Sequence, residues 1–133
     1  MKLTFRSGLA AHTSALQSAR TKALQEVGFV WQGKAVLAAP VDTGYLRASI
    51  APAVENEARQ HHARHKDATV SYQTPAVGPG TVAVGSNAEY AAAVHEDLDT
   101  PRRSGGPKFI EAPFRENERA WIDLIAKRLR EAT

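Results

Sequence analysis

The longest amphipathic pattern of the 133-residue chain lies between residues 9 and 38. Its apolar side chains recur at spacings of three, four and seven, the periodicity of one helix face. These positions are Leu9, Leu16, Ala23, Val27, Val30, Trp31 and Leu37. Frequent alanine favours a helix, whereas Gly28 and Gly33 each weaken it by up to about 1 kcal/mol. We predict one long helix with a single apolar stripe, in which the glycines mark a bend or a close helix–helix approach.

A segment rich in turn-forming residues ends this helix at positions 39–50. Pro40 has no N–H to donate and its ring clashes with the preceding turn, so the helix must stop there. Gly44 readily adopts a positive φ, and the side chains of Asp42 and Thr43 can cap the chain that follows. We expect a structural corner formed by Pro40, Asp42, Thr43, Gly44, Leu46 and Arg47. We also expect Arg47 to pair with an acidic group, across the fold or in a neighbouring subunit.

Alternation of apolar and polar residues predicts short strands in the middle of the chain. The pattern occurs at residues 2–6, 49–57, 68–73 and 81–85, with loops expected at 58–67 and 74–80. Because the later segments are close in sequence, an antiparallel meander of three to four strands is the simplest arrangement.

Two further helices are predicted in the last third of the chain. Asn87 is a good N-cap for a short helix over 88–96, and a basic loop over 97–108 follows it. Pro113 suits the first turn of a terminal helix. We therefore expect one α+β domain over residues 1–133, with long N-terminal and C-terminal helices packed on the sheet and one short helix.

Composition narrows the class of protein. The chain has no cysteine, which excludes disulfides and thiolate zinc sites and suits a reducing compartment. No apolar run reaches the roughly 18–20 residues that span a membrane. No long apolar stretch follows residues 1–6, so we expect no signal peptide. The net charge of +3 permits contact with nucleic acid without requiring it.

The triplet Asp42-Thr43-Gly44 is the signature of aspartic proteases, in which two such aspartates share a proton. Here the triplet follows a helix-ending proline, and a second triplet is absent. A capped turn is therefore the favoured interpretation, and an aspartic hydrolase using Asp42 is an alternative.

Three histidines at positions 61, 62 and 65 could place two imidazoles one helical turn apart, which suits a metal ion. The glutamate of the His-Glu-x-x-His motif is absent, so we favour a solvated basic loop and expect no metal or other cofactor. We expect Trp31 and Trp121 to be core residues rather than platforms on which bases stack.

Basic residues of the 97–108 loop raise a second alternative. Arg102, Arg103 and Lys108 could contact a phosphate backbone, as a basic nucleic-acid-binding module would require. Neither Pro79-Gly80 nor Gly105-Gly106 has the residue order of a phosphate-binding loop.

Three segments in order carry a family resemblance, which covers the chain from about residue 9 to its end. They are Ala39 to Ile50, with Pro40-Val41-Asp42-Thr43-Gly44, then Val82 to Glu96, and then Pro107 to Phe114. Together they resemble the small neck and tail-completion (head–tail joining) morphogenesis proteins of lambdoid long-tailed phages and prophages. The chain departs from the family at Asp97-Leu98-Asp99-Thr100, where a Phe-Gly-Thr-like turn is common.

The resemblance implies a non-enzymatic structural protein of the virion, present in the host cytoplasm during assembly. Such proteins form rings, often hexameric, around the channel through which DNA passes. The implied partners are further copies of the chain and the neighbouring neck, tail-terminator and tail-tube proteins. The loop with Arg102, Arg103 and Lys108 would contact a neck partner or line the channel, touching DNA without sequence preference.

Overall fold

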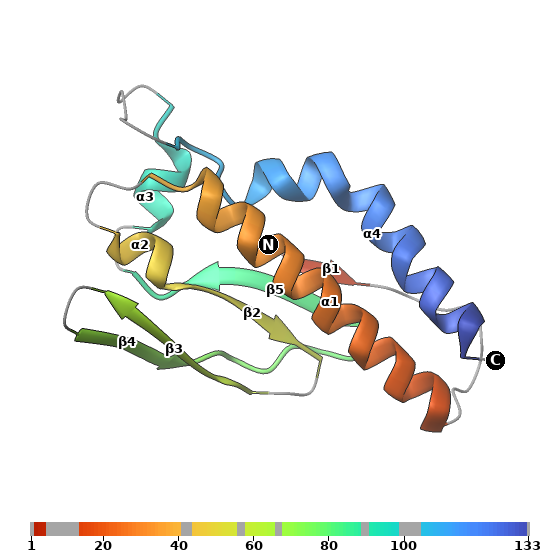
Figure 1. The fold of residues 1–133 in the computed structure, drawn as a ribbon. Helices are drawn as coiled ribbons and strands as arrows, with labels where there is room; N and C mark the ends of the chain where they lie inside the picture. The colour runs from red at the N-terminus through yellow and green to blue at the C-terminus, as the bar shows by residue number, and fades with distance from the viewer. Residues whose placement is uncertain are drawn as a thin grey trace.

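The computed structural model describes residues 2–4, 14–40, 44–55, 58–65, 68–88, 91–98 and 105–132, with the side chains at 64, 65, 68–70 and 72 outside this description. Its elements in chain order are β1 (Lys2–Thr4), α1 (Ser14–Ala38), α2 (Tyr45–Ala48), β2 (Ile50–Val54), β3 (Gln60–His65), β4 (Ala68–Gln73), β5 (Thr81–Ser86), α3 (Ala91–Glu96) and α4 (Glu111–Glu131). The predicted α+β class is confirmed (Figure 1).

Three strands form one antiparallel sheet in the order β1-β5-β2. The central strand β5 pairs Val82 with Leu3 of β1 and Val84 with Pro52 of β2. Because proline has no N–H for a second neighbour, Pro52 is tolerated only on an edge strand, which is the position of β2. Strands β3 and β4 form a separate two-stranded sheet in which Gln60 lies opposite Gln73.

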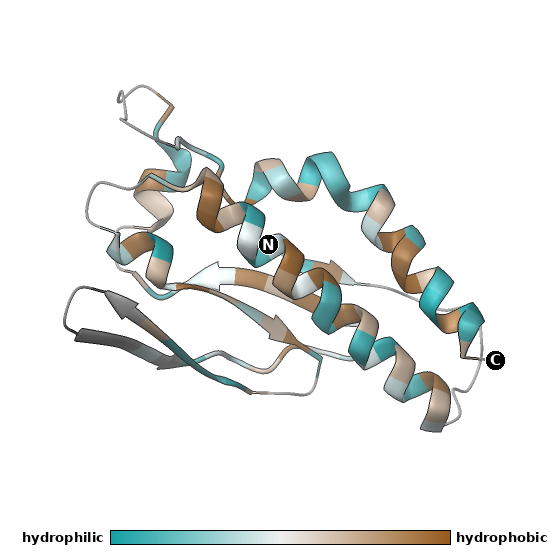
Figure 2. Ribbon diagram, viewed as in Figure 1, coloured by the Kyte–Doolittle hydropathy of each residue, from teal (hydrophilic) through white to brown (hydrophobic). Residues whose placement is uncertain are grey.

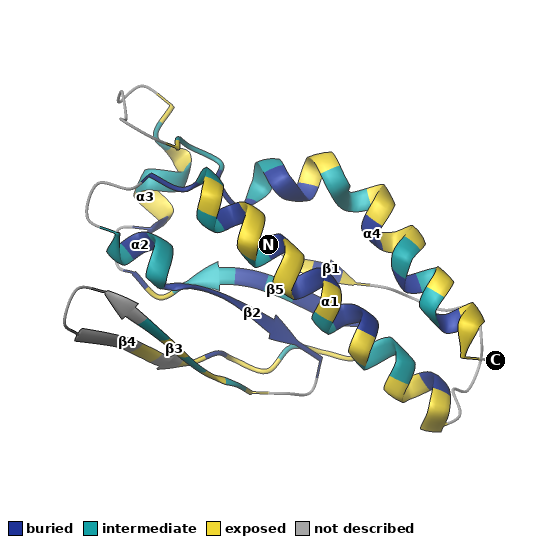
Figure 3. Cartoon of the chain, in the orientation of Figure 1, coloured by how far each residue is buried: buried dark blue, intermediate teal, exposed yellow. Residues whose placement is uncertain are grey.

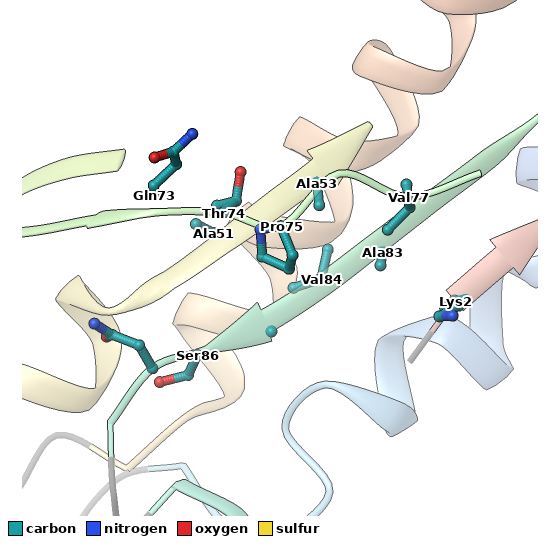
Figure 4. Close-up of a pocket in the computed structure, with 12 residues that line it drawn as sticks. Lys2, Ala51, Ala53, Gln73, Thr74, Pro75, Val77, Ala83, Val84 and Ser86 are labelled. Atoms are coloured by element: carbon teal, nitrogen blue, oxygen red, sulfur yellow. The ribbon is translucent and has the colours of Figure 1, made fainter. Parts of the chain in front are cut away.

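The predicted meander is wrong, because β5 pairs with β1 and β2 instead of β4. The segment after β4 passes over the outer side of β2, with a parallel bridge between Glu55 and Val77, before the chain enters β5 (Figure 4). Strands β4 and β5 are therefore neighbours in the sequence but do not pair with each other.

The loop predicted at residues 58–67 is also wrong, since residues 60–65 are strand β3. This segment has no apolar alternation that could have revealed a strand. The exposure of its side chains nevertheless alternates: Gln60 and His62 are exposed, whereas His61 and Ala63 are half-buried. Pairing with β4 decides the conformation, not the pattern of hydrophobicity.

Helix α1 lies against β2 and β5, and α4 runs antiparallel along α1 on the same side of the sheet (Figure 1). Trp31 at their contact is fully buried, and its Nε1–H donates to the carbonyl of Ile110 at 3.0 Å. Its ring lies 5.2 Å from that of Phe114 and 5.6 Å from that of Trp121. The predicted core role of both tryptophans is confirmed.

The contact between α1 and the sheet depends on Gly28. A Cβ atom at this position would lie 3.1 Å from Val82 Cγ2 and 3.2 Å from Pro52 Cβ. The helix can therefore approach the sheet closely only because position 28 has no side chain. The sequence predicted a close helix–helix approach or a bend at this glycine, and the structure corrects the partner, because Gly28 lies against the sheet.

A buried carboxylate ties the same helix to the strands. Glu55, whose side chain is 2% exposed, lies 2.9 Å from Arg20 Nε of α1 and accepts the Thr21 hydroxyl at 2.6 Å. Its second oxygen accepts the backbone N–H of Gly80 at 2.5 Å, just before β5. A buried carboxylate is stable only with partners of this kind.

Candidate assembly surfaces

The corner after α1 is built on the free carbonyl groups at the helix end. Arg47 donates from Nε to the carbonyl of Ala39 at 3.0 Å and from Nη2 to that of Leu37 at 3.2 Å. A cation is favourable there, since the last carbonyls of a helix carry partial negative charge. These two carbonyl oxygens are acceptors that the sequence did not reveal, and the acidic partner expected for Arg47, across the fold or in a neighbouring subunit, stays a prediction.

The remaining corner residues divide into two groups. Pro40 and Leu46 are buried, and Gly44 precedes α2 with φ of 77°, a left-handed conformation that glycine adopts without strain. Asp42 and Thr43 lie outside the described residues, so their capping role and the hydrolase alternative that depends on Asp42 stay untested.

The glycine pair at 105–106 closes the corner from the other side. Gly106 donates its N–H to the carbonyl of Ala38 at 3.0 Å. Gly105 has φ of 72°, and a Cβ atom there would lie 2.3 Å from the carbonyl oxygen of Ala39. In the sequence, this glycine pair was tested only against the phosphate-binding loop pattern, which it does not match. The close approach of Gly105 to the carbonyl of Ala39 could not be predicted, because tertiary packing creates it.

Lys108 belongs to a surface cluster between α3 and α4. Its ammonium contacts the Glu96 carboxylate and lies 3.4 Å from Glu111, while His95 Nδ1 lies 2.9 Å from Glu96. Hydrogen bonds from Lys108 and then His95 lower the pKa of Glu96, and the bond to Glu96 raises the pKa of Lys108. The other two candidate contact residues, at positions 102 and 103, lie outside the described residues.

The three histidines that sequence analysis considered as metal ligands lie on strand β3 instead of a helix, and the side chain at position 65 is outside the described residues. His61 Nε2 lies 2.8 Å from the carbonyl of Ala48, and His62 follows it directly, so the two side chains leave opposite faces of the strand. Within the described residues, no group of three or more His, Cys, Asp or Glu side chains is arranged to hold a metal ion.

An apolar groove lies on the face of the sheet turned away from α1 (Figure 4). Its floor consists of small residues, and its walls come from the segment after β4 on one side and from Lys2 on the other. We call it the sheet groove, with a volume of about 390 Å³ and lining residues that include Ala51, Ala53, Pro75, Val77, Ala83 and Gly85.

A second apolar surface lies on the outer side of α1. The predicted stripe is buried at Leu16, Ala23, Val27 and Trp31 but not at its last members. Val30 is 42% exposed and Leu37 is 75% exposed, and Phe29 beside them is 51% exposed. Figures 2 and 3 show brown and yellow positions in this C-terminal half of the helix. We call Phe29, Val30, Gly33 and Leu37 the α1 patch.

The comparisons with known proteins settle the family. Residues 5–96, more than half of the chain, match the bacteriophage HK97-gp10 family of candidate tail components. The chain belongs to this HK97-gp10-like family of phage tail components. The match includes the first two of the three segments that suggested a phage morphogenesis protein, and that recognition is confirmed. No curated protein and no solved structure matches the chain.

Family membership assigns the chain to the phage tail, and therefore to the virion, as a structural component. Within the described part of the chain, every helix is too short or too polar to cross a membrane. Sequence analysis identified neither the sheet groove nor the α1 patch, because a helical period does not reveal which of two apolar faces a neighbouring element covers.

Proposed function

We propose that this tail component forms a ring, hexameric by analogy with the family, that joins the tail to the head around the DNA channel. The observation that carries the proposal is the pair of apolar surfaces on opposite sides of one subunit, the α1 patch and the sheet groove. Exposed apolar patches mark interaction sites, and a subunit that binds neighbours on two sides is the unit from which a ring is built.

The connections within the subunit suit a rigid structural component. The polar connections at Glu55, Arg47 and Gly106 join the end of α1, the strands and the start of α4 into one body. Several basic side chains are already paired with carboxylates within the subunit: Arg20 with Glu55, Lys108 with Glu96, and Arg128 with Glu26. This pairing favours a structural component over a nucleic-acid-binding module, whose basic groups must be available to phosphates.

Cryo-electron microscopy of virions from the phage or prophage that carries the gene tests the location. We expect ring-shaped density between the portal and the tail tube into which this fold can be placed. Deleting the gene should leave filled heads and finished tails unjoined, and purified protein should restore joining. Intact particles that lack the protein at the neck would overturn the proposal.

A further inference from the structure

We propose that successive copies of the chain dock head to tail, with the α1 patch of one subunit seated in the sheet groove of the next. This inference rests on the proposed ring and identifies the surfaces that build it. A contact between two different surfaces of one chain is heterologous, and heterologous contacts close into a ring when the rotation between neighbours divides a full turn.

The α1 patch has the composition of a contact surface. Phe29, Gly33 and Leu37 follow one another at spacings of four, so they share one face of the helix. The N-terminal half of the same face is polar, with exposed Lys22 and Glu26. Exposed apolar side chains gathered on one face in this way mark interaction sites. Apolar character is thus confined to the half of the outer face nearest the corner.

The two glycines of α1 indicate what kind of surface covers each face. Gly28 lies against the subunit's own sheet, where a Cβ atom would approach Val82 and Pro52 to about 3.1–3.2 Å. Gly33 is five residues later, about 140° around the helix, on the outer face. A Cβ atom at Gly33 would meet nothing within 4 Å, so packing within the subunit does not account for this glycine. A second sheet on the outer face would account for it in the way that the first accounts for Gly28.

The sheet groove offers the matching surface. Its floor is accessible at Ala83 and Gly85, where another backbone can come close because neither residue has a long side chain, while Ala51 and Ala53 beside them are already buried within the subunit. A Cβ atom at Gly85 would also meet nothing within 4 Å. The patch extends about 12 Å along its helix from residue 29 to residue 37, and β5 extends about 10 Å along the groove from Ala83 to its end at Ser86. The two surfaces therefore have similar lengths.

These features favour a second copy of the chain as the occupant. Docking would place α1 between its own sheet and the sheet of the neighbour, with a glycine at each contact. Both surfaces belong to the same chain and lie on opposite sides of it, as head-to-tail assembly requires. Every subunit of a closed ring would then cover both of its apolar surfaces.

Engineered cysteines in assembled particles test the inference, and the natural sequence contains none that would interfere. The phage is built with Leu37→Cys and Gly85→Cys in one chain, and purified particles are treated with a short bismaleimide cross-linker. We expect a ladder of covalent multimers of this chain under denaturing conditions. Each single variant should remain monomeric. Ile122→Cys combined with Gly85→Cys is the matched control, because Ile122 is an exposed apolar residue on α4.

Each outcome decides a separate point. Particles that contain the protein but give no ladder would overturn the interface and leave the ring proposal standing. Dimers from the Leu37→Cys single variant would show that the α1 patches of two subunits contact each other. A cross-linked product with a different virion protein would show that another protein covers the α1 patch or the sheet groove. Either result overturns the inference. Particles without the protein would instead refute the proposed function on which it rests.

A second measurement separates assembly from folding. Leu37→Glu should leave the thermal unfolding temperature of the isolated protein unchanged and reduce the yield of joined particles at least tenfold. Ile122→Glu should leave both unchanged. Gly33→Ala should raise the urea midpoint of the isolated protein, since alanine favours helix, and still reduce joining. Normal joining with both Leu37→Glu and Gly33→Ala would contradict the docking arrangement.

Discussion

The buried carboxylate of Glu55 allows a stability prediction worked from its contacts. Replacing it by alanine removes the acceptor of the Gly80 N–H, and a buried donor left unsatisfied costs about 1–3 kcal/mol. It also leaves Arg20 without this partner, and breaking a buried ion pair costs about 3–5 kcal/mol. The Arg20 side chain is 16% exposed and can turn toward water, so the lower values apply. We expect Glu55→Ala to destabilise the fold by about 4 kcal/mol, the sum of the two lower values.

The isosteric variant refines the argument. Glu55→Gln keeps the shape of the side chain and one oxygen, which can accept either the Gly80 N–H or the Thr21 hydroxyl but carries no charge for Arg20. The expected destabilisation is about 1–2 kcal/mol, between the values for the wild type and Glu55→Ala. Equal losses for the two variants would show that the charge of the carboxylate accounts for the whole effect, whereas no loss in Glu55→Gln would show that burial of the alkyl chain, not the carboxylate, holds the strands to α1.

Equilibrium unfolding in urea measures these differences, with the fluorescence of the buried Trp31 and Trp121 as the signal. Dilute protein keeps assembly out of the measurement, since association would shift the apparent stability. Glu26→Ala is the control, because Glu26 pairs with Arg128 at the exposed surface and should give no resolvable change. If Glu55→Ala unfolds at the same urea concentration as this control, the reasoning about buried partners is refuted.

Three further predictions concern the corner, the surface cluster and the core. Gly105→Ala should cost more than about 2 kcal/mol, because it combines a positive φ with a clash at the end of α1, whereas Gly106→Ala should cost far less; equal urea midpoints would contradict this. Lys108→Ala should raise the pKa of Glu96 toward its ordinary value in an NMR titration. Because the pKa of Glu96 is lowered in the folded state, the stabilisation of the fold by this ion pair is present above the ordinary pKa and is lost as pH falls through the folded-state value. Trp31→Phe should cost about 1–3 kcal/mol in urea unfolding, since it leaves a buried carbonyl at the start of α4 without its donor, and a loss below 0.5 kcal/mol would indicate a replacement donor.

Local chemistry explains which elements could be predicted. Helix α1 ends just before Pro40, because proline has no N–H to donate and its ring clashes with the preceding turn. Pro113 lies in the first turn of α4, as expected. The strands at 2–4, 50–54, 68–73 and 81–86 also match the predicted segments closely. β3 escaped prediction because its stabilisation comes from pairing with β4, which no apolar pattern in its own residues reports.

Candidate site residues were harder to predict, since their roles depend on what lies beside them. The positive φ of Gly44 could be predicted from its residue type. The carbonyl acceptors of Arg47 could not, because the sequence does not show which backbone groups lie beside its side chain. Lys108 was chosen as a possible partner contact, and the structure places it in ion pairs with Glu96 and Glu111. Its role in assembly stays a prediction.

The sequence by itself determined the helical period, the breaks between elements, the α+β class and the phage family, because these follow from local backbone preferences and from motifs in order. Only the tertiary structure decided the strand order β1-β5-β2, the approach of Gly105 to the end of α1 and the division of α1 into a buried face and an exposed patch. Each of these depends on contacts between residues far apart in the chain. The α1 patch shows the difference clearly: Val30 and Leu37 belong to the apolar stripe predicted from the sequence, and only the position of the neighbouring sheet and helix shows that they face outward.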